Sequence, residues 1–300
     1  MSKVYSGVDG IPRGHASEVL VPGCLCLEGG AFRGVYGEGV LDAFMQEDLN
    51  FQTVIGVSAG ALNGLNYVAG QIGRSARTNL TYRHDSEYVG LKALHEAHSP
   101  LNLDFLLKTM NAVEPLDEQR FYRPEQRYLA VACSCLTGEP MYFEKGVCGD
   151  IMAAIKASAS MPYISPMVDV DGIPCLDGGS CCKIPYRWAL DQGFEKVVVI
   201  RTRERSYRKH EKRSHTAERV YRDYPEFAGK VDSSSRDYNV QCDELLELEQ
   251  SGRIFTIAPS EHVEVGRLEP DMEKLGALYW MGYADAKREL PGLRAYLGLG

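Results

Sequence analysis

Residues 51–60 read FQTVIGVSAG, and this segment decides the expected fold. Residues 51–55 are apolar and β-branched, as in a buried strand, and residues 61–69 are rich in alanine, leucine and asparagine, as in a helix. Between them, Gly56-Val57-Ser58-Ala59-Gly60 matches G-x-S-x-G, the pattern of a nucleophile elbow. Ser58 is therefore a candidate nucleophile. The alternative is a plain turn of small residues, since the pattern alone also arises by chance.

The composition is that of a soluble globular protein, with 300 residues, 44% hydrophobic and 25% charged. A formal net charge of -8 argues against nucleic-acid binding. No apolar run is long enough to span a membrane. The nine cysteines form an odd set without a preceding secretory signal, so we expect a reducing, cytoplasmic location without disulfides.

Five cysteines lie in or beside strand-like runs, where they are expected to be small buried hydrophobes: Cys24, Cys26, Cys133, Cys135 and Cys175. The pair Cys181-Cys182 raises the question of a metal site. No second pair at zinc-like spacing accompanies it, and we therefore expect neither a metal nor another cofactor.

Two strand–turn–helix units in the first seventy residues predict a parallel sheet with crossover helices. The first expected strand lies within 19–27, with 23–27 as its central part because Pro22 cannot donate to a sheet. The other expected strands are 51–55, 128–133, 197–200 and 254–258, with a short edge strand at 141–143. The expected helices are 35–47, 61–69, 150–160 with Asp150 as its N-cap, and 271–290, ended by Pro291-Gly292. Residues 1–17 are expected to be a loosely ordered lead-in, and a loop to reach Asp177.

Two further segments are open to two interpretations each. Residues 74–124 are expected to be helical or irregular, and the apolar run 101–107 within them to be a core element or part of a lid. Residues 201–222 interleave basic and acidic side chains. We expect a solvated helix and loop there, because the acids dilute the basic charge, with contact to an anionic lipid surface as the alternative.

Acyl transfer needs an oxyanion hole and a base beside the nucleophile. Residues 28–34, EGGAFRG, follow one strand and open a helix, so the amides of Gly29, Gly30 and Ala31 are candidate oxyanion donors. The same turn also resembles the phosphate-binding turn of a dinucleotide fold, but the second strand ends in the elbow rather than in the acid which that fold requires.

Two bases are possible. Asp177 is followed by Gly178 and Gly179, which would let its carboxylate approach Ser58 directly. The order Ser58, Asp177, His262 instead follows an α/β-hydrolase triad, although only one obvious strand precedes the elbow here.

Three motifs, residues 28–34, 56–60 and 177–179, resemble the signatures of patatin-like phospholipases, in the same order. The resemblance implies a three-layer α/β/α sandwich with a mostly parallel central sheet, and hydrolysis of lipid acyl esters. It further implies a Ser58–Asp177 dyad without histidine and an oxyanion hole around Gly29, Gly30 and Ala31, with Arg33 beside it. Gly34, Gly56, Gly60, Gly178 and Gly179 support these motifs.

The chain departs from the family pattern at two positions. Ala31 stands where a third glycine is usual, and its N–H remains available if its φ is negative. Glu28 replaces the usual aspartate before the turn.

We expect one domain over residues 1–300. It comprises a catalytic core at 22–200, a charged helical insert at 201–253 that is similar to that of bacterial members, and a strand and helix at 254–300 that complete the core.

The expected function is a lipid acyl hydrolase of the phospholipase A or lysophospholipase type. The alternatives are a catalytically weak lipid-binding or regulatory module, a nucleotide-binding protein, and the His262 triad. A lipid substrate implies peripheral membrane contact, for which segments 101–107 and 161–164 are candidates, with core packing as the alternative for both.

Overall fold

The computed structural model describes residues 3–211 and 216–299, and its centre is one eight-stranded sheet. Its order is β10-β9-β2-β3-β5-β8-β7, and β6 pairs with β5 outside this path. The neighbours from β10 to β5 are parallel, whereas β6, β7 and β8 join antiparallel. The strands are β2 (Leu20–Leu27), β3 (Asn50–Val57), β5 (Arg127–Ser134), β6 (Pro140–Glu144), β7 (Val168–Val170), β8 (Ile173–Asp177), β9 (Val197–Ile200) and β10 (Phe255–Ile257).

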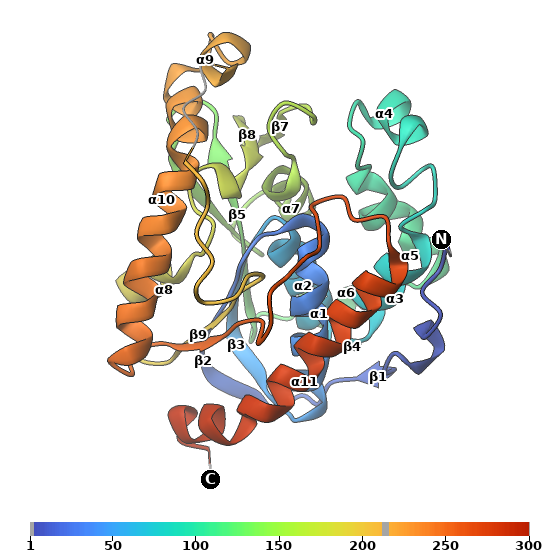
Figure 1. Cartoon of the computed structure of the whole chain (residues 1–300), viewed down its shortest axis with the longest axis vertical. Helices are drawn as coiled ribbons and strands as arrows, with labels where there is room; N and C mark the ends of the chain where they lie inside the picture. The colour runs from blue at the N-terminus through green and yellow to red at the C-terminus, as the bar shows by residue number, and fades with distance from the viewer. Residues whose placement is uncertain (1–2, 212–215, 300) are drawn as a thin grey trace.

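Helices cover both faces of the sheet (Figure 1). The α-helices are α1 (Val35–Gln46), α2 (Ala59–Val68), α3 (Arg74–Tyr82), α4 (Leu91–Ala97), α5 (Met110–Val113), α6 (Glu118–Phe121), α7 (Ile151–Ala159), α8 (Tyr186–Asp191), α9 (Thr216–Val220), α10 (Pro225–Gln250) and α11 (Met272–Leu297). Short helical turns are η1 (Val8–Gly10), η2 (Ala31–Gly34), the π-helical η3 (Phe105–Thr109) and η4 (Gly178–Ser180). Figure 1 shows α10 on one side of the sheet and α1, α2 and α11 on the other.

Alternation along the strands builds the two apolar layers, because successive side chains point to opposite faces. In β2, Leu25 and Leu27 join the core under α1, α2 and α11, while Cys24 and Cys26 join the core under α8 and α10. The expected three-layer α/β/α sandwich with a mostly parallel sheet is thus confirmed. All five cysteines expected to be buried are 0% exposed.

The C-terminal helix is packed closely against the first. The two helices α1 and α11 cross at Gly39 and Gly282, where an added Cβ would lie 2.0 Å from a backbone oxygen of the opposing helix. Buried polar bonds link them as well: the Tyr36 hydroxyl donates to Asp285 at 3.0 Å, and the Tyr279 hydroxyl donates to Asp42 at 2.7 Å. Residues at the two ends of the chain therefore share one core layer.

Most expected elements are present, with boundaries shifted by a few residues. Strand β9 matches the prediction, and Asp150 caps α7 by accepting hydrogen bonds from the amides of Met152 and Ala153. Residues 74–124 are helical or irregular, as expected. The first strand lies within residues 19–27, as expected, and begins before Pro22, because a register shift between Val21 and Cys24 accommodates the proline.

Three expectations about order and boundaries were wrong. The lead-in is not loose over its described part, since β1 (Gly14–His15) pairs with β4 (Gln71–Ile72) and Ile11 is buried. Asp177 ends strand β8 of a β-hairpin rather than a loop. Helix α11 continues past Pro291 to Leu297, because the buried Leu293 holds its last turns on the core.

Candidate active site

Ser58 lies at the turn from β3 to α2, in the strand–turn–helix context expected of an elbow. Its φ of 57° and ψ of -123° are unusual for a residue with a side chain and hold the hydroxyl out of the turn. Gly56 ends the strand side of the turn, and Gly60 lies against β2. A Cβ on Gly60 would lie 2.5 Å from the Leu27 carbonyl oxygen, so only glycine fits there.

The elbow is supported by a serine that the sequence analysis missed. Ser158, on α7, is 0% exposed, and its hydroxyl accepts a hydrogen bond from the Ser58 amide at 2.8 Å. The same hydroxyl donates to the Val131 carbonyl of β5 at 2.6 Å. Ser158 thus ties the strained turn to the sheet, and no pattern in residues 150–160 signals this role.

Asp177 meets Ser58 directly. The Ser58 hydroxyl donates to Asp177 Oδ2 at 2.8 Å, while Oδ1 accepts from the Gly179 amide at 2.7 Å. Asp177 is 6% exposed, and burial raises the pKa of its carboxyl against the opposing effects of these two hydrogen bonds. Gly178 lets β8 pack here, since its Cβ would lie 2.2 Å from the Val131 carbonyl oxygen.

The glycine-rich turn places free amides beside the serine. The amides of Gly30 and Ala31 have no hydrogen-bond partner among the described residues, whereas Gly29 donates to the Lys183 carbonyl at 3.4 Å. The Ala59 amide, directly after the nucleophile, also lacks a partner in the described chain and is a donor that the sequence analysis overlooked. These three unpaired amides, at the starts of η2 and α2, can donate hydrogen bonds to an anion.

The negative φ expected at Ala31 is not observed. Its φ is +50°, so alanine adopts the left-handed conformation that a glycine would take. The amide keeps the direction that a third glycine would give it, at the cost of local strain. Arg33 lies in the same turn, which Gly34 ends.

Glu28, the second departure from the family pattern, is a buried anchor. One of its carboxylate oxygens accepts from the Thr202 amide at 2.5 Å, and the other accepts from the Tyr238 hydroxyl at 2.8 Å. Arg201 Nε lies 4.0 Å away. Glu28 therefore joins the turn to β9 and to α10.

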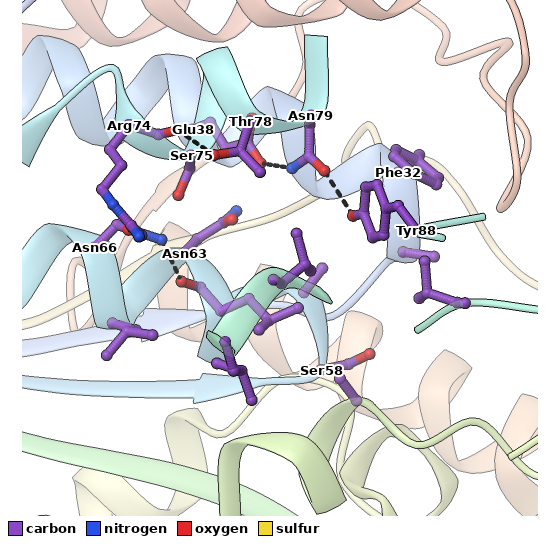
Figure 2. A pocket seen from close by; sticks show the side chains of 18 of the residues that line it. Phe32, Glu38, Ser58, Asn63, Asn66, Arg74, Ser75, Thr78, Asn79 and Tyr88 are labelled. Atoms are coloured by element: carbon purple, nitrogen blue, oxygen red, sulfur yellow. Dashed lines mark hydrogen bonds between the residues drawn. The ribbon is translucent and has the colours of Figure 1, made fainter. Parts of the chain in front are cut away.

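Ser58 opens into an apolar pocket of about 60 Å³ (Figure 2). Its apolar lining consists of Leu62, Leu65, Leu101, Leu106, Leu107 and Met161 among others. Leu101 is buried, so the run 101–107 serves as pocket wall and core.

Figure 2 shows Ser58 at one side of this pocket and Glu38, Asn79 and Tyr88 across from it. Asn79 donates to Glu38 at 2.6 Å and accepts from Tyr88 at 2.8 Å. Burial raises the pKa of Glu38 to about 8, so this acid is mostly protonated at neutral pH. The wall opposite Ser58 is therefore polar, and its charged member is Arg74 (Figure 2), whose guanidinium donates to neutral oxygens of Asn66, Asn111 and the Glu114 carbonyl.

Ser58 also borders a second, polar cavity of about 600 Å³, which Asp177 shares. Five basic side chains line it: Arg33, Lys183, Arg203, Lys209 and Arg267. Segment 161–164 lines it too. The expectation that residues 201–222 form only a solvated face was wrong, because Arg203 and Lys209 turn toward this cavity; residues 212–215 lie outside the described part.

His262 is not beside Ser58. Its side chain is 68% exposed, and its Nδ1 lies 2.7 Å from Glu204 Oε1. It lines neither the apolar pocket nor the polar cavity.

Within residues 3–211 and 216–299, no helix combines the length and apolar character needed to cross a bilayer. In the same ranges, no three His, Cys, Asp or Glu side chains gather as a metal ion would require.

The sequence is similar to several curated proteins. It is 31% identical to the uncharacterised protein YjjU of Escherichia coli over 188 residues, which cover 60% of this chain and 52% of that protein. It is 29% identical to an uncharacterised NTE family protein of Mycobacterium bovis over 167 residues, covering 54% and 43%. The chain thus spans about half the length of the curated relatives it matches.

Solved structures and two family models also match. VipD from Legionella pneumophila aligns over 95% of this chain and 69% of its own, with 13% identity and a TM-score of 0.47. A model described as a domain of unknown function, DUF6363, matches residues 224–298. The model described as patatin-like phospholipase matches residues 25–190, more than half of the chain. The chain therefore belongs to the patatin-like phospholipase family.

Proposed function

We propose that this chain is a serine acyl hydrolase that cleaves carboxylic esters of lipids. The observation that carries the proposal is the 2.8 Å hydrogen bond from the Ser58 hydroxyl to Asp177, formed where an apolar pocket meets a polar cavity. A nucleophile bonded to its base at the mouth of an apolar pocket suits an ester with a hydrocarbon acyl chain.

The reaction follows from this arrangement. Ser58 Oγ attacks the ester carbonyl carbon as its proton passes to Asp177, and the amides of Gly30, Ala31 and Ala59 stabilise the oxyanion. When the tetrahedral intermediate collapses, the ester C–O bond breaks and Asp177 returns the proton to the leaving alkoxide. Water then attacks the acyl-enzyme carbonyl carbon and gives a proton to Asp177. As the bond from that carbon to Ser58 Oγ breaks, Asp177 passes the proton to Oγ, which releases the carboxylic acid and restores the Ser58 hydroxyl and the Asp177 carboxylate.

Burial makes Asp177 suited to this role. An aspartate with an ordinary pKa of about 4 is a weak base for a hydroxyl. Loss of hydration destabilises the ionised carboxylate and raises the pKa of Asp177, so the group accepts a proton more readily. The charges of Lys183 and Arg267 oppose this rise in the pKa of Asp177, because a positive charge nearby favours the ionised carboxylate.

The apolar pocket sets an expectation for the acyl chain. A pocket of about 60 Å³ has room for only a few water-sized groups, so it suits a short acyl chain. Longer chains would have to displace the side chains of segment 101–107. We therefore expect p-nitrophenyl esters of short acids to be the better substrates.

Substitution at the dyad tests the proposal. Ser58→Ala and Asp177→Asn should each lower kcat/KM for a p-nitrophenyl ester by roughly a thousandfold or more. A fluorophosphonate probe should label the wild-type protein at Ser58 and not label Ser58→Ala. Unchanged far-ultraviolet circular dichroism would show that the variants are folded.

His262→Ala is the control for the alternative triad. Because His262 bonds to Glu204 at the surface, this variant should retain full activity. Loss of activity there would contradict the dyad, and absence of labelling in folded wild-type protein would favour a lipid-binding module without turnover.

Peripheral membrane contact is part of the proposed function, together with a cytoplasmic location. Tyr163, 47% exposed, lies beside the polar cavity, and Leu91 on α4 is 85% exposed. Sedimentation with anionic and neutral vesicles tests the contact, and failure to co-sediment with either would argue against it.

A further inference from the structure

The polar cavity beside Ser58 is strongly basic. The five basic residues named above face only three carboxylates among the described lining residues, namely Glu28, Asp177 and Asp232. This excess stands out because the chain as a whole carries a formal net charge of -8. Cations concentrated in one cavity of an acidic protein indicate a site for an anion.

The five basic side chains are not neutralised by ion pairs. None of them lies within 4.0 Å of a carboxylate oxygen in the described parts of the chain. Lys183 donates to the carbonyls of Gly179 and Ser234, and Arg203 to that of Val263. Lys209 Nζ lies 4.5 Å from the centre of the Tyr238 ring. Neutral partners hold these cations in place while leaving their charge unbalanced.

Arg33 is the member closest to the catalytic turn. Its Nε is buried and has no hydrogen-bond partner among residues 3–211 and 216–299. An unpartnered buried donor costs free energy unless a ligand supplies an acceptor. The guanidinium of Arg33 therefore provides an independent sign that an acceptor-rich group binds here.

Repulsion among the five basic side chains is a further sign that the cavity binds an anion. Burial, followed by the charges of Lys183 and Arg267, lowers the pKa of Lys209 to about 6, so its amine is mostly neutral at neutral pH until a bound anion favours the ammonium form. Burial, followed by the charges of Arg203 and Arg267, lowers the pKa of Arg33 to about 10. The charge of Glu28 offers limited relief, because that carboxylate is bound to Thr202 and Tyr238 and faces Arg201.

We propose that this cavity binds a phosphate monoester carried by the substrate itself, so that the enzyme prefers acyl glycerol phosphates to uncharged or zwitterionic esters. The inference rests on the proposed hydrolase function. A phosphate monoester brings about two negative charges and three acceptor oxygens, which match several arginine and lysine donors. Since Ser58 and Asp177 border the same cavity, the phosphate and the scissile ester can belong to one molecule.

Kinetics on matched substrates test this assignment. The substrates are hexanoyl glycerol phosphate, uncharged hexanoyl glycerol and zwitterionic hexanoyl glycerophosphocholine, each used as a monomer in solution. We expect kcat/KM for the phosphate monoester to exceed that for either other ester by about tenfold or more. A ratio near one would overturn the proposal.

Variants assign the preference to the cavity. Lys209→Gln and Arg267→Gln should each lower the ratio of kcat/KM between the phosphate and the uncharged ester by about fivefold or more. Exposed residues outside the cavity provide matched controls, and Lys274→Gln and Arg13→Gln should leave the ratio unchanged. A ratio unaffected in both cavity variants, or lowered equally in both controls, would contradict the assignment.

Inorganic phosphate separates a free anion from a substrate group. If the cavity binds the substrate's phosphate, inorganic phosphate should compete with the phosphate ester and raise its KM in the wild-type protein more than in Lys209→Gln. Binding of inorganic phosphate without any preference among the three esters would overturn the substrate assignment. If Ser58→Ala hydrolysed all three esters, the proposed function would fail; if hydrolysis required Ser58 but showed no preference, only this further inference would fail.

Discussion

At the scale of single residues, the site depends on strained backbone conformations and on a buried carboxylate, both of which lower the stability of the folded protein. Ser58 and Ala31 both have positive φ, and the Asp177 carboxylate is buried beside the serine. Each of these features lowers stability while placing a group where the proposed chemistry needs it. Substitutions that relieve the cost should therefore be measurable as gains in stability.

Ala31→Gly tests the cost at the glycine-rich turn. Glycine adopts positive φ freely, so the variant should raise the free energy of unfolding by about 1 kcal/mol, measured in urea, while activity is retained. The exposed Ala284 on α11 is the matched control, because Ala284→Gly places glycine in a helix and should lower stability by about 1 kcal/mol. A loss of stability in Ala31→Gly would argue against strain at this position.

Asp177→Asn tests whether the buried, ionised carboxylate lowers the free energy of unfolding. Because the pKa of Asp177 is raised in the folded state, its ionisation favours unfolding, and this destabilisation grows as the pH rises from about 4 through the folded-state pKa. The inactive variant should therefore unfold at a higher urea concentration than wild type at pH 7. The gain should vanish below about pH 4, where both states of the wild type hold the proton. A gain that does not depend on pH would contradict this cause.

At the scale of elements, the elbow depends on a contact between α7 and the β3–α2 turn. Strand β3 and helix α2 were predictable from residues 51–69, because their patterns are local. The support from Ser158 was not, since its hydroxyl meets a residue 100 positions away. Helix α11 shows the same limit: Pro291 suggested an end, but the packing of Leu293 and the hydrogen bonds of Tyr296 to Val197 and Arg253 hold the helix beyond it.

Ser158→Ala tests the elbow contact. The change leaves the buried Ser58 amide without its acceptor, which should lower the free energy of unfolding by about 1–3 kcal/mol. The Ser58 hydroxyl would then be misplaced. Because this hydroxyl acts in the chemical step, kcat should fall by a larger factor than KM changes. Ser165, whose hydroxyl pairs with Ser99 away from the dyad, is the control, and Ser165→Ala should leave kcat unchanged. An unchanged kcat in Ser158→Ala would contradict a positioning role.

At the scale of the whole molecule, the C-terminal third completes the fold. The family models match residues 25–190 and 224–298 separately, yet β10 extends the central sheet and α11 packs on α1. Glu28 joins the catalytic turn to Tyr238 on α10. These contacts support the prediction that residues 1–300 form one domain.

Calorimetry tests that prediction. A single domain should unfold in one transition whose calorimetric and van't Hoff enthalpies agree. Tyr238→Phe removes the donor to buried Glu28 and should lower the midpoint of that same transition by a few degrees. Two separate transitions, only one of them shifted by Tyr238→Phe, would show two units instead.

The sequence by itself determined the layered sheet and the order of the three motifs. Period-two apolar strands, small residues at turns and helix caps act over a few neighbouring residues, so local physics reveals them. The family resemblance already predicted that Ser58 pairs with Asp177, 119 positions away. Only the tertiary structure decided which other groups join them at the site: Ser158 supports the elbow, and Lys209 and Arg267 line the polar cavity from loops beyond residues 25–190. Such meetings depend on how helices and strands pack across the molecule, and no local pattern encodes a charge cluster assembled from distant loops.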